Sequence, residues 1–399
     1  MKNFFQIFAF LIACLFAWNV MADGHEVGEL KDALADLEER LNDLEDAAEE
    51  DTAAGWWTKT AVGGYGELHY NNNNGSGKID FHRYVLFFSH RYNDSVVMNS
   101  EFELEHAIAG GGSTIKEKGE VELEQAYIGH NWKEYGMPDT DMKYGVFLIP
   151  CGITNEIHEP PTFYGVERNT VEKEICSNTR WEGGIQATHA VPDWDLTIIA
   201  GVHSSLTTSD GDIRGGRDKV ASATMNKEAY SGAFRWTGAY PGLELGYSWE
   251  YAPDMNEGQS GPQVEGTMHA VHANYMPSRG FGARAFYGVW DLKCPAAGTD
   301  HNACATNGRD YQWGYFYEGS YRFDVTETQS MGFFVRRENW DDKAGTKNAT
   351  TNKNNTTRNS VGVNWWLAEG AVLKIDWEKK KAFGSNAVNG VNLGMGYSF

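Results

Sequence analysis

The sequence predicts an all-β protein, a 16-stranded antiparallel transmembrane β-barrel with a short N-terminal α-helical coiled coil. Short segments of alternating apolar and polar residues follow one another through residues 56–399, with clusters of Gly, Asn, Asp and Pro between them. The chain holds 14 Trp, 19 Tyr and 20 Phe, an aromatic content typical of the interfacial girdles of membrane barrels. No apolar run of 18 residues follows residue 55, so no transmembrane helix is predicted there.

The first 22 residues are predicted to be a secretory signal peptide. Lys2 supplies a positive start, residues 4–18 form an apolar core, and Val20-Met21-Ala22 fits a small-residue cleavage site. A lipoprotein acylation box at residues 11–14 is the alternative. Because the apolar core continues past Cys14, the ordinary signal peptide is favoured, and we expect the rest of the chain to be exported.

Residues 23–55 are predicted to form a periplasmic coiled-coil segment. Apolar residues recur at alternating spacings of three and four, which is a heptad pattern. They are Val27, Leu30, Leu34, Leu37, Leu41, Leu44 and Ala48. A helix over this stretch would extend about 33 Å, and so narrow an apolar stripe requires a partner, so a homotrimer is expected. A single amphipathic helix lying on the barrel is the alternative.

Sixteen candidate strands can be placed in residues 56–399, the predicted transmembrane β-barrel domain. They cover residues 60–70, 78–91, 95–108, 119–131, 140–149, 181–190, 194–203, 228–239, 243–252, 266–276, 280–292, 310–322, 328–340, 358–367, 371–382 and 389–399. An even strand number and alternating short and long connections are typical of bacterial membrane barrels. The long connections, expected on the extracellular side, are residues 109–118, 150–180, 204–227, 253–265, 293–309 and 341–357.

Alternation within the strands assigns side chains to the lumen or to lipid. Carboxylates are costly in hydrocarbon, so a row of glutamates on two neighbouring strands is expected to face a water-filled lumen. These are Glu101, Glu103, Glu105, Glu120, Glu122 and Glu124, with Val121, Leu123 and Tyr127 on the opposite face. Basic residues expected to face inward are Arg235, Arg284, Arg322, Arg336 and Lys374. The two sets either create a transverse field across the lumen or pair with charges on neighbouring strands.

Residues 150–180 form the longest gap between strands and the third outer loop. Its charged residues are candidates for a pore constriction. They are Glu156, His158, Glu159, Glu167, Arg168, Glu172, Lys173 and Arg180. His158 offers a metal ligand beside carboxylates, but a loop histidine satisfied by hydrogen bonds is favoured, and no metal site is assigned.

Four cysteines follow the signal peptide. Cys151 and Cys176 bracket most of the third outer loop, and Cys294 and Cys304 bracket a short polar segment. An exported chain meets an oxidising compartment, so each pair is a disulfide candidate, with free thiols as the alternative. The Cys and His spacings fit neither a haem nor a zinc motif, so no cofactor is expected. No Ser-His pair lies in a Gly-x-Ser-x-Gly context, so no catalytic residue and no enzymatic activity are assigned.

Three segments of the first half of the chain resemble a known family. Residues 155–168, Glu101-x-Glu103-x-Glu105-His106 and Trp181-Glu182-Gly183-Gly184 resemble outer-membrane porins of the phosphate-selective O and P type, within the general bacterial porin superfamily. The resemblance covers most of residues 60–190. It implies a passive outer-membrane channel for small hydrophilic solutes or ions, with phosphate or other anions among the candidates. In 16-stranded porins the third outer loop folds inward and narrows the channel, so residues 150–180 are expected to do the same.

The C-terminal residues carry a second resemblance. Apolar side chains occupy every second position from Val391 to Phe399, and small or polar residues fill the gaps. This pattern resembles the closing strand of bacterial outer-membrane barrels, in which the barrel assembly machinery recognises the terminal Phe and its alternating partners. Tyr397 and Phe399 are therefore the expected assembly signal. The expected location is the outer membrane of a Gram-negative bacterium, with outer-membrane lipid around the barrel and the coiled coil in the periplasm.

Net charge weakens the case for phosphate as the permeant. The chain carries −21, of which residues 23–51 account for −11 and residues 52–399 for −11, with Lys2 adding +1. An acidic pore attracts cations, so weak cation preference or little selectivity is expected. The alternative function is a structural outer-membrane anchor or tether that uses the N-terminal coiled coil. No nucleic-acid partner is expected.

Overall fold

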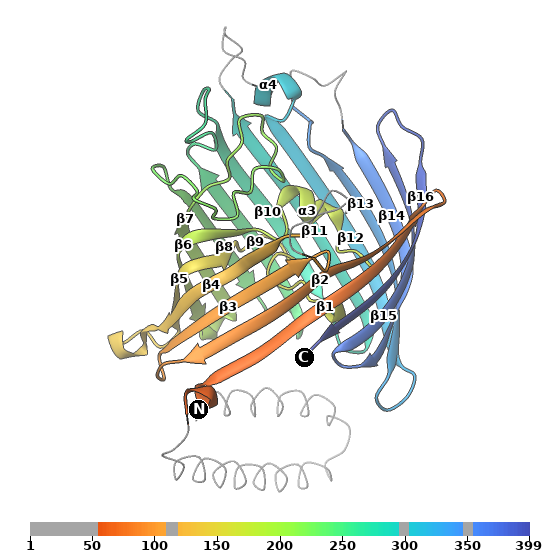
Figure 1. Cartoon of the computed structure of the whole chain (residues 1–399), viewed down its shortest axis with the longest axis horizontal. Coiled ribbons are helices and arrows are strands. Elements are labelled where there is room, and N and C mark those ends of the chain that lie inside the picture. The colour runs from red at the N-terminus through yellow and green to blue at the C-terminus, as the bar shows by residue number, and fades with distance from the viewer. Residues whose placement is uncertain (1–54, 109–118, 295–302, 346–353) are drawn as a thin grey trace, which may run out of the picture. The chain divides into compact units, whose positions relative to one another are not determined.

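The computed structural model describes residues 55–108, 119–294, 303–345 and 354–399. The predicted signal peptide and coiled coil therefore lie outside the described residues. The chain divides into two compact units, of which the larger comprises residues 62–90 and 95–399 and contains the barrel (Figure 1). Of the smaller unit, the structure describes residues 55–61 and 91–94, which include the short 3-10 helix η1 (Trp56–Lys59).

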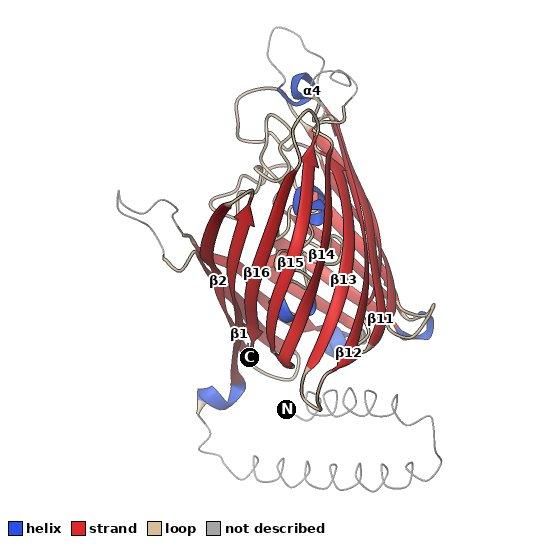
Figure 2. Ribbon diagram, turned by 90° about the vertical axis from the view of Figure 1, so that its right-hand side faces the viewer, coloured by secondary structure: helices blue, strands red, loops and turns tan. Residues whose placement is uncertain are grey.

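Sixteen antiparallel strands close into a barrel, and β1 pairs with β16 to complete the ring (Figure 2). The strands are β1 (Thr60–Asn73), β2 (Ser76–Arg91), β3 (Val96–Glu105), β4 (Val121–Asn131), β5 (Thr140–Leu148), β6 (Trp181–Val191), β7 (Leu196–His203), β8 (Ala229–Trp236), β9 (Leu243–Ala252), β10 (Glu265–Tyr275), β11 (Gly280–Lys293), β12 (Tyr311–Asp324), β13 (Ser330–Asp341), β14 (Thr356–Ala368), β15 (Ala371–Ala382) and β16 (Val388–Ser398). The predicted fold class and strand number are confirmed, and every predicted strand matches an observed one to within three residues at each end. Among the described residues, no helix has the length and apolar character needed to cross a membrane.

The first and last strands close the barrel through a regular antiparallel pairing. The pairing of β1 with β16 runs without interruption from Tyr65 opposite Ser398 to Asn73 opposite Gly390. The hairpin from β1 to β2 turns on Asn74 and Gly75, with φ angles of 50° and 87°. A two-residue hairpin of this kind needs positive φ at both positions, which Asn and Gly adopt at the least steric cost.

The strands carry apolar side chains on their outer face, whereas their inner face carries buried charged side chains together with buried aromatic ones. In β13, Val335 is 60% exposed whereas the adjacent Arg336 is 4% exposed. In β15, Ile375 is 48% exposed between Lys374 and Asp376, which are each 5% exposed. Exposed apolar residues around a charged interior are the reverse of a soluble protein, and they are what a barrel surrounded by hydrocarbon requires.

The predicted lipid-facing position of Tyr127 is wrong, because β4 contains a β-bulge. Glu101 pairs with Gln125 while the next residue, Phe102, pairs with Leu123, so one residue of β4 has no partner on β3. An extra residue in one strand shifts its facing by one position. Tyr127 therefore shares the inner face with Gln125, and the Lys143 ammonium lies 4.9 Å from its ring centroid.

Candidate functional site

The third outer loop, residues 149–180, joins β5 to β6 and crosses the interior of the barrel (Figure 1). Its 3-10 helix η3 (Pro160–Thr162) contacts β15 and β16, and its helix α3 (Thr170–Ile175) contacts β11, β12 and β13. The loop thus reaches strands far from the two that it connects. We refer to residues 149–180 as the inserted loop.

Both predicted cysteine pairs are joined in the structure. Cys151 and Cys176 form a disulfide with their Cα atoms 5.6 Å apart, which ties the two ends of the inserted loop together. Cys294 and Cys304 form the second disulfide, with a Cα separation of 6.0 Å, at the short helix α4 (Ala303–Asn307). The first disulfide therefore limits how far the inserted loop can unfold on its own.

A buried carboxylate organises the base of the inserted loop. Glu172 is 0% exposed and accepts hydrogen bonds from the Ile153 backbone nitrogen at 2.5 Å and from the Thr154 hydroxyl at 2.6 Å. The Asn169 side chain caps α3 by accepting a hydrogen bond from the Glu172 backbone nitrogen at 2.8 Å. The structure therefore places Glu172 in the buried scaffold of the loop, without contact with solvent.

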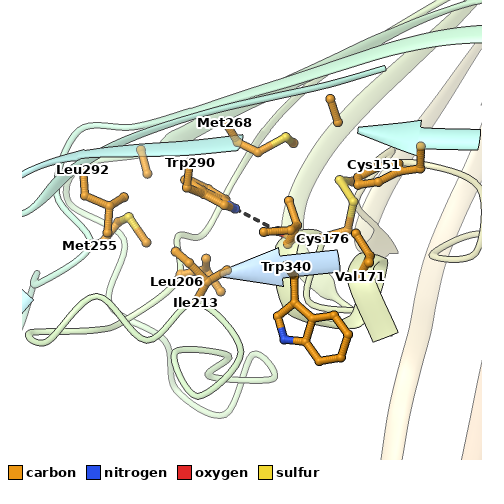
Figure 3. Packing of buried hydrophobic residues seen from close by; sticks show 14 of the residues in the cluster. Cys151, Val171, Cys176, Leu206, Ile213, Met255, Met268, Trp290, Leu292 and Trp340 are labelled. Atoms are coloured by element: carbon orange, nitrogen blue, oxygen red, sulfur yellow. Dashed lines mark hydrogen bonds between the residues drawn. A yellow bond between two sulfur atoms is a disulfide. The ribbon is translucent and has the colours of Figure 1, made fainter. Parts of the chain in front are cut away.

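An apolar cluster packs α3 against the inner wall (Figure 3). Val171 and Ile175 of α3 belong to the same buried cluster as Phe286 and Trp290 of β11. The Trp290 indole nitrogen also donates to the Ile175 carbonyl at 2.8 Å. A Cβ on Gly288 would lie 2.8 Å from the Ile175 side chain, so glycine makes room on the wall for the helix. This cluster is the main apolar core of the described barrel unit.

Side chains of the far wall bind backbone groups of the inserted loop. Arg336 of β13 donates to the Tyr164 carbonyl at 2.6 Å, and Asp376 of β15 accepts from the Val166 backbone nitrogen at 2.6 Å. Buried backbone groups need hydrogen-bond partners, so these contacts supply what the loop would otherwise obtain from water. They fix the middle of the loop against the strands opposite its origin.

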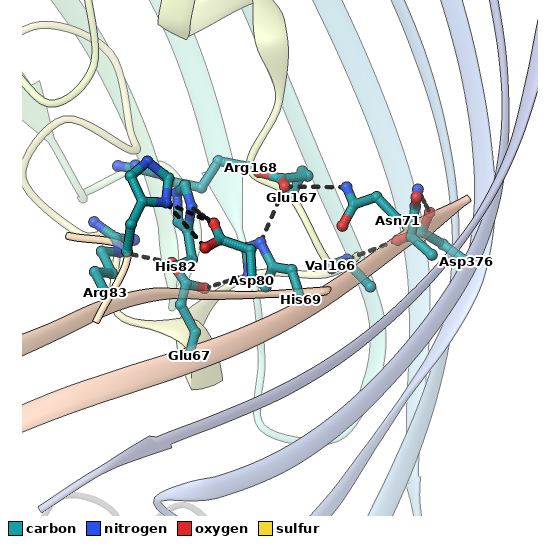
Figure 4. A network of polar contacts seen from close by, with 12 residues as sticks. Glu67, His69, Asn71, Asp80, His82, Arg83, Val166, Glu167, Arg168 and Asp376 are labelled. Atoms are coloured by element: carbon teal, nitrogen blue, oxygen red, sulfur yellow. Dashed lines mark hydrogen bonds and ion pairs between the residues drawn. The ribbon is translucent and has the colours of Figure 1, made fainter. Parts of the chain in front are cut away.

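Glu167 lies in a polar network that joins the inserted loop to β1 and β2 (Figure 4). Its carboxylate is 3.0 Å from one ring nitrogen of His69, and the other ring nitrogen is 3.1 Å from Glu67. Arg83 then donates to Glu67 at 2.6 Å and to the backbone carbonyl of His158 at 3.1 Å. The network holds two separate points of the loop against the same pair of strands.

The deepest of the predicted acidic residues surround His158. Glu101, Glu103 and Glu124 are each at most 2% exposed. The His158 Nε2 atom is 3.6 Å from Glu101 Oε1 and 3.5 Å from Glu124 Oε2. Burial lowers the pKa of the His158 imidazole, but the two carboxylates outweigh burial and raise this pKa to about 8.

The remaining predicted acidic residues lie nearer to solvent. Glu120 precedes β4 and its side chain is 57% exposed, whereas that of Glu122 is 8% exposed. Both carboxylates form ion pairs with Lys219, which belongs to the fourth outer loop, residues 204–228. Glu105, the last residue of β3, is half-buried. The acidic wall therefore runs from a buried inner group to Glu105 and Glu120, which keep contact with solvent.

Two of the predicted basic residues pair across neighbouring strands. Arg284 of β11 and Arg336 of β13 lie 2.7 Å and 3.0 Å from the carboxylate of Glu318, on β12 between them. The guanidinium of Arg322 instead lies 3.7 Å from the ring centroid of Trp366. The sequence left open whether the inward charges create a transverse field or pair across neighbouring strands. The Glu318 cluster shows pairing across neighbouring strands.

The other two predicted basic residues contact the inserted loop directly. Arg235 of β8 forms an ion pair with Glu156. The Lys374 ammonium of β15 lies 3.5 Å from the ring centroid of Phe163. The carboxylate of Glu156 attracts the Arg235 guanidinium, and the aromatic face of Phe163 attracts the Lys374 ammonium. Both contacts therefore add to the attachment of the loop to the wall.

Arg180, at the end of the inserted loop, is the centre of a buried ion cluster. Its guanidinium donates to Glu182 at 2.9 Å and to both carboxylate oxygens of Glu250, at 2.6 Å and 2.8 Å. The Arg180 side chain is 2% exposed and the two carboxylate side chains are each 1% exposed. The structure therefore places Arg180 in the wall, whereas the sequence suggested a constriction.

Sequence reasoning missed the arginines of the fourth outer loop. Arg214 donates to the Ser177 carbonyl at 2.8 Å, and Arg217 donates to the Thr179 carbonyl at 2.6 Å. Burial, together with the guanidinium groups of Arg217 and Arg168, lowers the pKa of Arg214. Residues 204–228 have no strand or helix periodicity, so the charged run from Arg214 to Lys219 was the one available signal.

The predicted constriction residues differ in exposure. Those that keep contact with solvent are Glu156, Glu159, Glu167, Arg168 and Lys173. Those that the structure buries are His158, Glu172 and Arg180.

The C-terminal residue lies beside β1. Phe399 is 64% exposed, and its backbone forms two hydrogen bonds of 2.9 Å with Gly64 of that strand. Its ring stacks on that of Tyr397 at a centroid distance of 6.4 Å.

Comparisons with known proteins support the barrel fold. The chain is similar to an anion-selective porin from Comamonas acidovorans (TM-score 0.55, 10% identity, 85% of this chain and 99% of that chain). It is similar to OmpF of Salmonella typhi, solved in complex with daunomycin (TM-score 0.55, 10% identity, 85% and 97%). It is also similar to a trimer form of OmpT, an outer membrane protein of Vibrio cholerae (TM-score 0.54, 10% identity, 85% and 99%). At these identities the likeness shows a general porin fold.

Sequence comparison adds one relative. An uncharacterized protein from Aquifex aeolicus is 37% identical to this chain over 188 residues, which is 45% of this chain. The match spans only 39% of that relative's length. No family model matches the chain.

Proposed function

We propose that the chain is a passive outer-membrane channel through which small hydrophilic solutes or ions diffuse. The observation that carries this proposal is the inserted loop, which lies inside a closed barrel with an apolar outer face and a charged inner face. A loop in this position narrows the path, and its charged side chains set which solutes pass. Outer-membrane lipid against the apolar face accounts for its exposed Val, Ile and Leu side chains.

For the permeant, we propose small solutes of either charge, with phosphate or other anions as candidates within the porins of the O and P type. The constriction residues that keep contact with solvent are of mixed charge, since Glu156, Glu159 and Glu167 are acidic and Arg168 and Lys173 are basic. The acidic residues outnumber the basic ones, as they do in the barrel sequence as a whole. A small excess of acids favours cations weakly.

Ion preference can be measured from the reversal potential of single channels in a planar bilayer under a KCl gradient. We expect discrete conductance steps and a small potential of the sign that cation preference gives. Lys173→Glu, on an exposed position of α3, should shift the potential further toward cation preference. The matched control is Arg279→Glu, in the turn between β10 and β11, which should leave the potential unchanged. Strong anion preference in the wild type would contradict this expectation and would favour phosphate.

For the organisation of the chain, we propose a signal peptide at residues 1–22, a periplasmic coiled coil at 23–55 and the barrel at 56–399. We further propose a homotrimer formed through barrel and coiled coil, and insertion by the barrel assembly machinery through Tyr397 and Phe399. The structural anchor or tether remains the second hypothesis. The bilayer experiment separates the two, because an anchor whose lumen is closed would show no conductance steps.

A further inference from the structure

We propose that Glu101, Glu124 and His158 form a binding site for a divalent transition-metal ion such as Zn²⁺, which fastens the inserted loop to the acidic wall. The two glutamates come from β3 and β4, and the histidine comes from the inserted loop, so the ion would join the two parts. The sequence assigns no metal site, because nothing in it shows that His158 lies beside these glutamates. The proposal does not depend on the channel function.

The spacing of the three ligand atoms fits a metal ion and is too long for good hydrogen bonds. His158 Nε2 is 3.6 Å from Glu101 Oε1 and 3.5 Å from Glu124 Oε2. One ligand atom from each of the three side chains lies within 4.8 Å of the others. An ion with bonds of about 2.0–2.2 Å in tetrahedral geometry holds its ligands about 3.3–3.6 Å apart. The separations from the imidazole nitrogen therefore match the edges of such a site.

Two of the three atoms that face this point lack a hydrogen bond in the described part of the chain, and the third, Glu101 Oε1, accepts a long one from the Tyr65 hydroxyl at 3.5 Å. His158 Nε2 and Glu124 Oε2 are both buried and have no hydrogen-bond partner among the described residues. The two side chains are 3% and 0% exposed. Buried polar atoms are nearly always paired, and a separation of 3.5 Å leaves these two with only a long ion pair, which a bound cation would replace with two short bonds.

The opposite ends of the same three side chains are held in place. His158 Nδ1 donates to the Asn155 carbonyl at 3.1 Å, so a metal ion would take the place of the proton on Nε2. Gln125 donates to Glu101 Oε2 at 2.7 Å, and Thr179 donates to Glu124 Oε1 at 2.8 Å. Metal-binding histidines and carboxylates are oriented in just this way by partners on their far atoms.

Charge also favours a divalent cation here. Glu103 lies beside the site, and its Oε1 atom has no hydrogen-bond partner among the described residues. The Arg83 guanidinium is 4.0 Å from Glu103 and is already bound to Glu67 at 2.6 Å. Within the described residues, Glu101 and Glu124 form their ion pairs with His158, and neither carboxylate pairs with an arginine or a lysine. One imidazole nitrogen with carboxylate oxygens is a donor set that suits Zn²⁺ and its first-row neighbours.

A second group, Asp80, His82 and His106, lies nearby and serves as an internal control. Its histidine nitrogens already contact Asp80, at 3.3 Å and 2.8 Å, and its side chains are 27–33% exposed. These contacts give a network satisfied without an ion. The buried group around His158 is therefore the better candidate.

The test is calorimetric titration of Zn²⁺ into the full-length, detergent-solubilised protein after chelator treatment. We expect one tight site in the wild type. Glu124→Gln and His158→Asn should each weaken zinc binding at least about tenfold, since losing a ligand costs no less than losing one of its supporting partners. His82→Asn should leave the affinity unchanged. Heat-dependent gel migration checks that each variant still folds.

Zinc location gives a readout that does not require any variant to fold. Crystals of the wild-type protein soaked in Zn²⁺ should show an anomalous peak between Glu101, Glu124 and His158. Three results would overturn the proposal: no zinc bound to the wild type, equal affinity in a folded Glu124→Gln variant, or a peak at His82 in place of His158.

Discussion

Replacing Arg180 with methionine should lower the free energy of unfolding by about 3–5 kcal/mol, the cost of leaving buried charges without their partner. The guanidinium satisfies two carboxylates, Glu182 and Glu250, and all three side chains are almost completely buried. Removing it leaves two adjacent negative charges away from water. Urea titration of the refolded protein in detergent micelles, followed by tryptophan fluorescence, measures the change.

Two matched variants separate the buried cluster from a general loss of charge. Arg279→Met removes an arginine that is 43% exposed and pairs with Asp324, so it should cost at most about 1 kcal/mol. Adding Glu250→Gln to Arg180→Met removes one of the two stranded charges and should restore part of the stability. Equal losses for Arg180→Met and Arg279→Met would show that the Arg180 cluster does not hold the inserted loop to the wall.

Replacing Ile375 with arginine should destabilise the folded barrel by about 2–4 kcal/mol, the usual cost of a cation on the lipid face near the middle of a membrane barrel. Ile375 is 48% exposed on β15, and its partners Val363 and Leu393 place three apolar side chains in one row. An arginine there would meet hydrocarbon. Folding titrations in lipid vesicles measure the loss.

The control for this variant lies on the inner face. Asn71 of β1 donates to the Glu167 carboxylate at 3.4 Å, so Asn71→Arg places its cation beside an acid inside the barrel. It should change stability by less than about 1 kcal/mol, as hydrated charges do. If Asn71→Arg costs as much as Ile375→Arg, the assignment of lipid and lumen to the two faces is wrong.

The barrel could be predicted because its strands repeat one simple rule. Strands such as β11, β13 and β15 show period-two alternation and end at turn residues, and both signals are local. Strand β16 is an example: Val391 and Leu393 are exposed, whereas Asn392 between them is 2% exposed. The bulge in β4 broke the rule, since one extra residue shifts every position that follows, and Tyr127 was misplaced for that reason.

The interior of the site could be predicted only in outline. The length and charge of residues 150–180 suggested an inserted loop, but its partners are far away in sequence. Val166 binds Asp376 across 210 positions, and Arg214 reaches the loop from a segment without periodicity. Local patterns carry no information on such contacts. Exposure is equally hidden in the sequence, so the prediction groups His158, Glu172 and Arg180 with residues that keep contact with solvent.

The central claim, that the inserted loop restricts a water-filled channel, is tested most directly by removing the loop. Cys151 and Cys176 have Cα atoms 5.6 Å apart, so a Gly-Ser-Gly linker in place of residues 152–175 can join them without disturbing β5 or β6. At the same salt concentration in a planar bilayer, the single-channel conductance of this variant should be clearly larger than that of the wild type. An unchanged conductance, or no conductance steps from either folded protein, would contradict the account.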